Sequence, residues 1–186
     1  MKKGRIVLTA IALASMISAK AKIVLPDLVS DNMVLQQQTE ARLWGKATPK
    51  STVEVRCSWT NRIFRTTALQ DSTWLLTVAT PKASFTPQTI VITEKGDKEA
   101  NSVKLGNILI GEVWICSGQS NMEMPVKGFK GQPVNGSADL ILMAKSSVPI
   151  RTCNLQRAKA LTPQDECACS WGENTPENVA NASATA

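Results

Sequence analysis

One serine lies on a short polar turn that follows an apolar run in the middle of the chain. Residues Ile108–Ile115 form a largely apolar run that predicts a buried strand, and the sequence Ser-Gly-Gln-Ser-Asn at 117–121 predicts a tight turn. A serine on the turn that leaves the C-terminal end of a strand is where α/β hydrolases present a nucleophile. Ser120 is therefore the candidate catalytic residue. Its neighbours Gln119 and Asn121 either bind substrate or the oxyanion, or only fix the turn.

The base that such a serine needs is missing. None of the 186 residues is histidine. A serine hydroxyl is a weak nucleophile at neutral pH and needs an adjacent base, most often histidine. Glu112 is not favoured in this role, because it lies on a separate stretch and is more typical of a solvated or hydrogen-bonded strand residue. The structural alternative for Ser120 is a serine that caps the segment after it.

The first 21 residues have the pattern of a secretory signal peptide. Lys2, Lys3 and Arg5 precede an apolar stretch at 6–17, and Ala-Lys-Ala follows at 19–21. A membrane anchor is disfavoured, because spanning a bilayer takes about 20 apolar residues. We expect cleavage after Ala21 and a periplasmic or secreted protein without a membrane span.

Charge and cysteine content narrow the possible partners. Removing residues 1–21 lowers the formal charge from +6 to +2, so the remainder has no basic excess that indicates nucleic acid. The odd number of cysteines leaves at least one thiol unpaired within the chain. The spacing of Cys167 and Cys169 and the lack of histidine argue against zinc, and we expect no metal and no cofactor. Disulfide pairing stays open among five cysteines: Cys57, Cys116, Cys153, Cys167 and Cys169.

Residues 22–106 predict an antiparallel β-sandwich domain. Short strands alternate with turn signals, and no stretch is typical of a helix. Residues 52–59 alternate, which places Val53, Val55, Cys57 and Trp59 on one face, and residues 62–68 run back as the partner strand. Three tryptophans are interpreted as core residues rather than as a sugar platform: Trp44, Trp59 and Trp74.

Residues 107–186 predict the incomplete start of an α/β domain. The run at 108–115 is apolar on both faces, as in a parallel strand covered by helices. Residues 138–145 predict a helix, residues 149–155 a second strand and residues 183–186 the opening of another helix. Asp165 and Glu166 are interpreted as surface charges rather than as a catalytic pair. The overall fold class is therefore mixed, with a truncated second domain.

The chain resembles the sialate O-acetylesterase family, within the SGNH-type serine esterases. The segments that carry this resemblance occur in the order expected of the family. They are Leu25–Gln36, Arg42–Ala47, Asp71–Trp74, Gly111–Trp114, Cys116–Glu123, Pro149–Arg151 and Ser183–Ala186. The match at Cys116–Glu123 covers the family's nucleophile block, and the resemblance spans essentially the whole chain after residue 21.

The resemblance implies a β-sandwich that leads into an SGNH-like α/β catalytic domain. It implies removal of O-acetyl groups from sialic acid or related acetylated sugars, with Ser120 as the nucleophile. The family's triad aspartate and histidine lie in a later segment that this chain lacks, so we expect the chain alone to be nearly inactive. The alternatives are a carbohydrate-binding or interaction fragment without activity, a protein that pairs with a separately supplied C-terminal half, and a fragmentary gene product without function.

Overall fold

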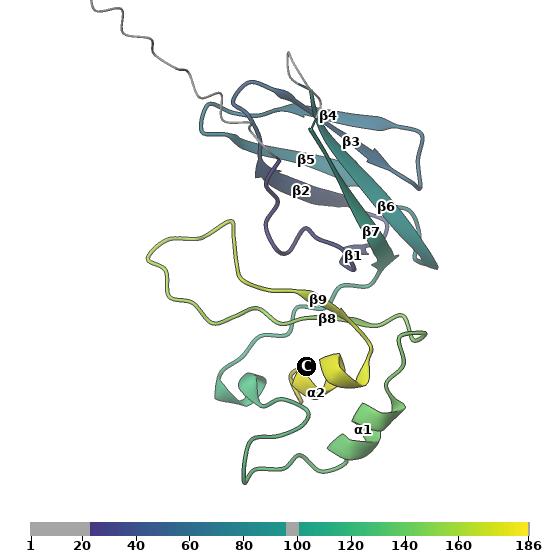
Figure 1. The fold of residues 1–186 in the computed structure, drawn as a ribbon, viewed down its shortest axis with the longest axis vertical. Helices are drawn as coiled ribbons and strands as arrows, with labels where there is room; N and C mark the ends of the chain where they lie inside the picture. Colours follow the sequence, from purple (N-terminus) through teal and green to yellow (C-terminus); the bar gives the residue numbers. More distant parts are fainter. Residues whose placement is uncertain (1–22, 96–100, 186) are drawn as a thin grey trace, which may run out of the picture.

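The structure is a computed structural model that describes residues 23–95 and 101–185 (Figure 1). The expected signal peptide, 1–21, lies outside the described residues. The strands are β1 Val34–Gln36, β2 Glu40–Lys46, β3 Thr52–Cys57, β4 Ile63–Thr67, β5 Thr73–Ala79, β6 Ser84–Lys95, β7 Asn101–Gly111, β8 Arg151–Cys153 and β9 Trp171–Glu173. The helices are a 3-10 turn at Ser120–Glu123, α1 Ser137–Met143 and α2 Pro176–Asn181. We call the described residues up to Gly111 the N-terminal part and those from Glu112 onward the C-terminal part.

The N-terminal part consists of strands in two sheets. One sheet is mixed and has the order β1-β7-β6-β3-β4, in which β1 pairs parallel with β7 and the other pairs are antiparallel. The other sheet is the antiparallel pair β2-β5. The expected pairing of the strand at 52–59 with the segment at 62–68 is confirmed by the register of β3 against β4. The molecule is thus mostly strand with few helices, and its mixed sheet is curled.

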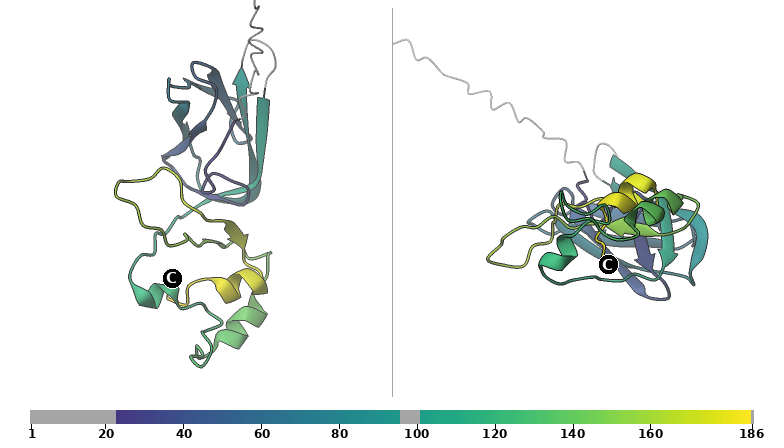
Figure 2. Two further views of the ribbon diagram at one scale, coloured as in Figure 1. Left: turned by 60° about the vertical axis from the view of Figure 1, so that its left-hand side comes forward. Right: turned by 90° about the horizontal axis from the view of Figure 1, so that it is seen from below.

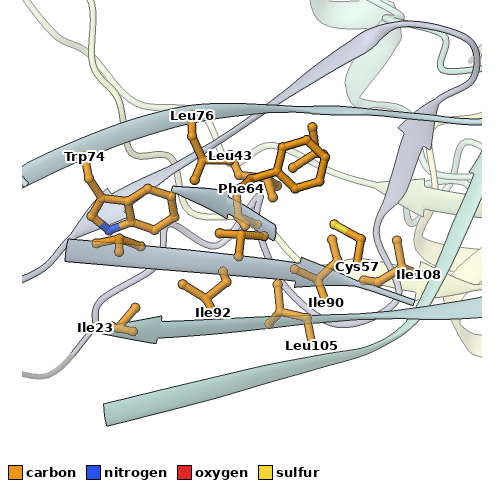
Figure 3. Packing of buried hydrophobic residues seen from close by; sticks show 14 of the residues in the cluster. Ile23, Leu43, Cys57, Phe64, Trp74, Leu76, Ile90, Ile92, Leu105 and Ile108 are labelled. Carbon is orange, nitrogen blue, oxygen red and sulfur yellow. The ribbon is translucent and has the colours of Figure 1, made fainter. Parts of the chain in front are cut away.

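The core of the N-terminal part contains side chains from both sheets. Val53, Val55 and Cys57 are buried on one face of β3. Leu43 of β2 and Trp74 of β5 belong to the same buried cluster as Cys57 (Figure 3). Because alternate residues of a strand face the same side, the period-two pattern of β3 buries all three of its apolar residues together. The predicted face is confirmed for these three residues, whereas Trp59, predicted on the same face, lies beyond the end of β3 and is only partly buried.

The three tryptophans are associated with this core. Trp74 is buried, and Trp44 and Trp59 are partly buried and pack against the same cluster. Their interpretation as core residues is confirmed, although the indole nitrogens of Trp44 and Trp59 both reach backbone carbonyls outside it.

The strand expected at Ile108–Ile115 is corrected by the structure. The apolar run is divided at Gly111, where β7 ends, so Ile108 is buried whereas Trp114 and Ile115 are 84% and 90% exposed. The first half pairs antiparallel with β6 and parallel with β1, and therefore belongs to the first sheet rather than starting a second one. In the described residues the second half forms no strand. The expected domain boundary between residues 106 and 107 falls inside β7.

The C-terminal part contains short elements only. The helix expected at 138–145 is present as α1, and the strand expected at 149–155 is present as β8. However, β8 pairs antiparallel with β9, so the expected parallel arrangement is wrong for this strand. The prediction of a helix from Ser183 is also wrong over the described residues, because Ser183 forms a β-bridge with Pro125 instead.

The two parts touch through a long loop between β8 and β9, which lies against the first strands (Figures 1 and 2). The Trp44 indole N–H donates to the Asp165 carbonyl (3.0 Å), and Lys46 forms an ion pair with Glu166 (2.9 Å). At the base of the loop, the Trp171 indole N–H donates to the Leu28 carbonyl (2.9 Å). None of the helices in the described residues is long and apolar enough to cross a membrane.

Candidate functional site

Ser120 opens a single 3-10 turn that leaves its side chain on the surface. The Met122 N–H donates to the Gln119 carbonyl (2.8 Å), and the Met124 N–H donates to the Asn121 carbonyl (3.3 Å). Gln119, Ser120 and Asn121 are all exposed. The structure therefore places the three predicted site residues on one exposed turn, although they were adjacent in sequence already.

The turn is held from behind by a segment that the sequence analysis did not connect with it. Residues 180–185 run antiparallel to residues 124–127. The Val126 N–H donates to the Ala182 carbonyl (2.9 Å), and the Ala184 N–H donates to the Met124 carbonyl (2.8 Å). The Thr185 hydroxyl reaches the Asn121 carbonyl (3.4 Å), so this segment contacts the turn itself.

Helix α2, which leads into this segment, was missed in the sequence although it has a start signal. Its N-cap is Thr175, whose hydroxyl accepts from the Asn178 N–H (3.3 Å), and Pro176 and Glu177 follow. Threonine, then proline, then an acidic residue is typical of a helix N-terminus. The threonine hydroxyl accepts from an unpaired N–H, proline has no N–H to leave unpaired, and the acidic side chain is favoured by the helix dipole. The signal stood in a polar stretch with too few apolar residues to show a helical period.

No base contacts the candidate nucleophile. Within residues 23–95 and 101–185, no side chain forms a hydrogen bond with the Ser120 hydroxyl. The acid nearest in sequence, Glu123, forms an ion pair with Arg157. An unassisted serine hydroxyl holds its proton at neutral pH, so the turn presents a nucleophile that is not activated.

Glu112 is occupied in a structural role. Its carboxylate accepts from the Gln36 side-chain amide (2.9 Å) and from that of Gln37 (2.5 Å), and these two bonds lower the pKa of Glu112. A lowered pKa makes a carboxylate a weaker base. The interpretation of Glu112 as a hydrogen-bonded residue is confirmed.

Gln36 and Gln37 also fix the start of the segment that leads to the serine turn. The Gln36 side-chain carbonyl accepts from the Val113 N–H (2.8 Å), and the Gln37 N–H donates to the Gly111 carbonyl (2.8 Å). Strand β1 thus directs the chain as it leaves β7. Beyond this anchor, residues 114–119 are exposed and form no regular element.

A separate cavity of about 320 Å³ lies where the two parts meet. Its lining includes Phe85, Asn107, Arg151 and Glu173, and does not include Ser120. The Arg151 side chain is only 4% exposed; it forms an ion pair with Glu173 (3.1 Å) and donates to the Asn107 side-chain carbonyl (3.3 Å). We interpret this network as a structural contact between β7 and the β8-β9 pair.

The acidic pair at 165–166 lies far along the chain from the serine turn. Asp165 and Glu166 are both exposed, and the carboxylate of Glu166 is bound by Lys46. Their interpretation as surface charges is confirmed. The described residues contain no group of three histidine, cysteine or acidic side chains arranged to hold a metal ion.

Comparison with known structures defines the class of fold. The chain is similar to the crystal structure of a carbohydrate acetylesterase from Xanthomonas citri, with a TM-score of 0.75 and 21% sequence identity. The similarity covers 87% of this chain and 34% of that one. The arrangement of strands and short helices is therefore similar to that of about a third of this solved chain.

Curated relatives then give the family. The chain is 31% identical over 164 residues to the sialate O-acetylesterase of Mus musculus and 29% identical over 158 residues to that of Homo sapiens. These alignments cover 84% and 81% of the chain but 29% of each relative, so the chain spans under a third of their length. No protein-family model matches the chain. The resemblance to the sialate O-acetylesterase family is confirmed.

Proposed function

We propose that the chain is part of a serine esterase that removes O-acetyl groups from sialic acid or related acetylated sugars. The observation that carries the proposal is Ser120, which begins an exposed turn inside the segment that resembles the family's nucleophile block. The similarity to curated sialate O-acetylesterases and to a carbohydrate acetylesterase supports the substrate class. Ser120 and its two neighbours are assigned here as the reacting and binding residues.

The proposed reaction is acyl transfer through the serine. A base removes the proton from the Ser120 hydroxyl as the oxygen attacks the acetyl carbonyl, and the sugar oxygen leaves with a proton. In this proposal, backbone N–H groups of the turn and the side-chain amides of Gln119 and Asn121 donate to the developing oxyanion. Water then attacks the acetyl-serine and releases acetate.

We propose that the base comes from outside these 186 residues. The chain holds no histidine, and Glu112 and Glu123 are engaged by glutamine side chains and by Arg157 respectively. General-base assistance contributes roughly 10²–10⁴-fold to such reactions. The chain alone is therefore expected to hydrolyse acetyl esters roughly 10²–10⁴-fold more slowly than an esterase with its base in place.

The second candidate function, an interaction fragment, is favoured by the surface of the C-terminal part. Trp114 and Ile115 on one segment, and Leu142 and Met143 on α1, are all at least 72% exposed, which is unusual for large apolar side chains. We propose that a polypeptide equivalent to the unmatched part of the relatives covers these residues and supplies the base. The protein is proposed to act in the periplasm or outside the cell, where residues 1–21 would direct it.

Reconstitution tests the proposal. Hydrolysis of an aryl acetate and of an O-acetylated sialic acid is measured for the purified chain, alone and mixed with a polypeptide that corresponds to the unmatched part of a relative. Activity that needs both pieces and is lost in Ser120→Ala is the expected result, and Ser137→Ala, at the start of α1, is the matched control. Activity that persists in Ser120→Ala, or no activity in a folded, stable complex of the two pieces, contradicts the assignment.

A further inference from the structure

The outer face of the five-stranded sheet carries exposed cations in three neighbouring rows, where a row is a set of residues opposite one another on adjacent strands. Val53 and Val55 of β3 are buried in the core, so the residues that alternate with them, Glu54 and Arg56, lie on the outer face. The first row is Thr67, Thr52 and Lys95; the second is Arg65, Glu54, Thr93 and Ser102; the third is Ile63, Arg56, Val91 and Lys104.

One carboxylate faces four cations in these rows. Glu54 forms ion pairs with Arg56 (2.8 Å), Arg65 (3.1 Å) and Lys95 (2.9 Å). The side chain of Glu54 is 3% exposed beneath them, whereas those of the three cations are 55–57% exposed. Lys104 is exposed too, and the three rows contain no other acidic residue. Four cations against one anion leave this face with a net charge of +3.

The cations keep donors that Glu54 does not use. Arg65 donates to Glu54 through its Nε atom (3.1 Å), and within the described residues its two terminal nitrogens donate to no protein acceptor. In the same part of the chain Lys104 forms no ion pair. Between them, the hydroxyls of Thr93 and Ser102 are hydrogen-bonded to each other (3.2 Å) on the outer face. Guanidinium groups bind carboxylates, and hydroxyls both donate to and accept from the hydroxyls of a sugar.

We propose that this outer face binds a polysaccharide that bears carboxylates, namely a chain of sialic acid residues. Its charge is complementary to that of the polymer, and its free guanidinium and ammonium donors and its hydroxyl pair match the carboxylates and hydroxyls of such a sugar. The choice of sialic acid among carboxylate-bearing sugars rests on the proposed function, in which the acetylated substrate is sialic acid or a related sugar.

Two other classes of polyanion fit the face less well. Proteins that bind single-stranded nucleic acid stack bases on aromatic side chains, and the three rows contain none. The major groove of DNA admits a helix or a two-stranded ribbon, whereas this face is the side of a five-stranded sheet. Membrane-surface elements insert apolar side chains, but the apolar residues of the rows, Ile63 and Val91, are partly buried.

The spacing of the cations suits a polymer rather than a single sugar. Arg65 on β4 and Lys104 on β7 are separated by β3 and β6, which places their strands about 14 Å apart at about 4.8 Å per strand. One carboxylate cannot reach both, whereas a chain with repeated carboxylates can engage several cations at once. Each exposed contact is weak, so the affinity comes from their number.

Strand β7 connects this face with the segment that leads to the serine turn. Lys104 lies near the start of β7 and Gly111 ends it, which is a distance of about 24 Å at about 3.4 Å per residue. A polymer held on the face keeps its other acetylated residues close to the molecule. The face therefore raises the local concentration of substrate around the proposed nucleophile without contacting the reacting atoms.

Binding of polysialic acid to the purified chain tests the proposal, with dextran as the neutral polymer. Lys104→Glu reverses a cation that pairs with no described residue, and Lys130→Glu makes the same charge change at an exposed position in the C-terminal part. We expect polysialic acid but not dextran to bind, and Lys104→Glu but not Lys130→Glu to weaken binding about fivefold. Binding should be lost at about 1 M salt, where the Debye length is about 3 Å.

Arg65→Gln, which leaves Glu54 with two of its three cations, is the second variant of the face and should also weaken binding. No binding of polysialic acid by the folded wild-type chain overturns the proposal, and so do equal losses in Lys104→Glu and Lys130→Glu. Tighter binding of duplex DNA, or of vesicles that contain phosphatidylserine, also overturns it, because the occupant is then another class of polyanion.

The binding measurement is independent of turnover. Ser120→Ala should bind polysialic acid as the wild type does, because the serine turn is not part of the face. Binding without any activity in the reconstitution experiment contradicts the proposed function alone. Activity there without binding of polysialic acid contradicts only the inference about the face.

Discussion

The N-terminal and C-terminal parts differ in where they place their apolar residues. Strands of the N-terminal part bury Val53, Val55, Ile90 and Ile92 completely, and a single cluster contains nearly all of the buried apolar side chains. In the described residues after Gly111, the buried apolar side chains are Val126, Ala144 and Ala182, each 8–9% exposed. The first part can therefore stabilise itself by burial of apolar surface, whereas the second depends on contacts along loops and on a covering partner.

The largest expected effect comes from the core of the N-terminal part. Ile92→Ala leaves a cavity in a fully buried site and should lower the free energy of unfolding by about 2–5 kcal/mol. Urea denaturation followed by tryptophan fluorescence measures this value. A loss below about 1 kcal/mol would show that the cluster is loosely packed and would remove the contrast between the two parts.

A second prediction concerns acid stability of the same part. Glu54 is buried on β3 and is bound by Lys95, Arg56 and Arg65, which hold its pKa at about 2. Because this folded-state pKa lies below the ordinary value of 4.5, the carboxylate stabilises the fold above pH 4.5, and that contribution is lost as the pH falls towards 2.

Glu54→Gln should therefore lower stability at pH 7 and flatten the dependence of stability on pH between 4.5 and 2. Urea midpoints measured across this range provide the readout. Glu40→Gln, at an exposed position on β2, is the control and should follow the wild type. A wild-type slope in Glu54→Gln would mean that other carboxylates carry the acid sensitivity.

The rate of cysteine alkylation should differ between the two parts of the molecule. Burial in the core raises the pKa of Cys57 to about 12, so this thiol is both shielded and protonated, whereas Cys116 is exposed beside the serine turn. Under native conditions iodoacetamide should alkylate Cys116 well before Cys57, as measured by mass spectrometry of tryptic peptides. Equal rates would show that the core opens as readily as the loop.

The smallest effect is expected on α1. Leu142 is 78% exposed, so Leu142→Ala removes few contacts and should change the free energy of unfolding by less than about 0.5 kcal/mol. The same substitution should weaken binding of a covering polypeptide in the reconstitution experiment. A stability loss comparable to that of Ile92→Ala would show that α1 is already covered in the isolated chain.

Local patterns in the sequence predicted much of the N-terminal part. The alternation at Val53, Val55 and Cys57 determined which face of β3 is buried, because a period of two allows only one assignment. The apolar run at Ile108–Ile115 could not be divided in the same way. Both halves are largely apolar, and only the pairing of β7 with β6 and with β1, which is distant in sequence, shows that the strand ends at Gly111.

The candidate site was predictable in position but not in its surroundings. The exposed turn at Ser120 followed from its small polar residues. The contacts behind it join residues 124–127 to residues 180–185, and neither segment has a periodic pattern that indicates a partner. The engagement of Glu112 by Gln36 and Gln37 is likewise a contact across 75 or more positions, which no local rule predicts.

The backbone bonds between Val126 and Ala182 and between Met124 and Ala184 set an order of events during protein synthesis. The turn that holds Ser120 cannot be fixed until the ribosome has added almost 60 further residues, which takes roughly 3–12 s at typical rates of elongation. The strands of the N-terminal part are complete by Gly111 and can assemble in that interval. The nascent chain therefore carries a formed core and an unsettled serine turn for several seconds, and a chaperone or a partner polypeptide would meet it in that state.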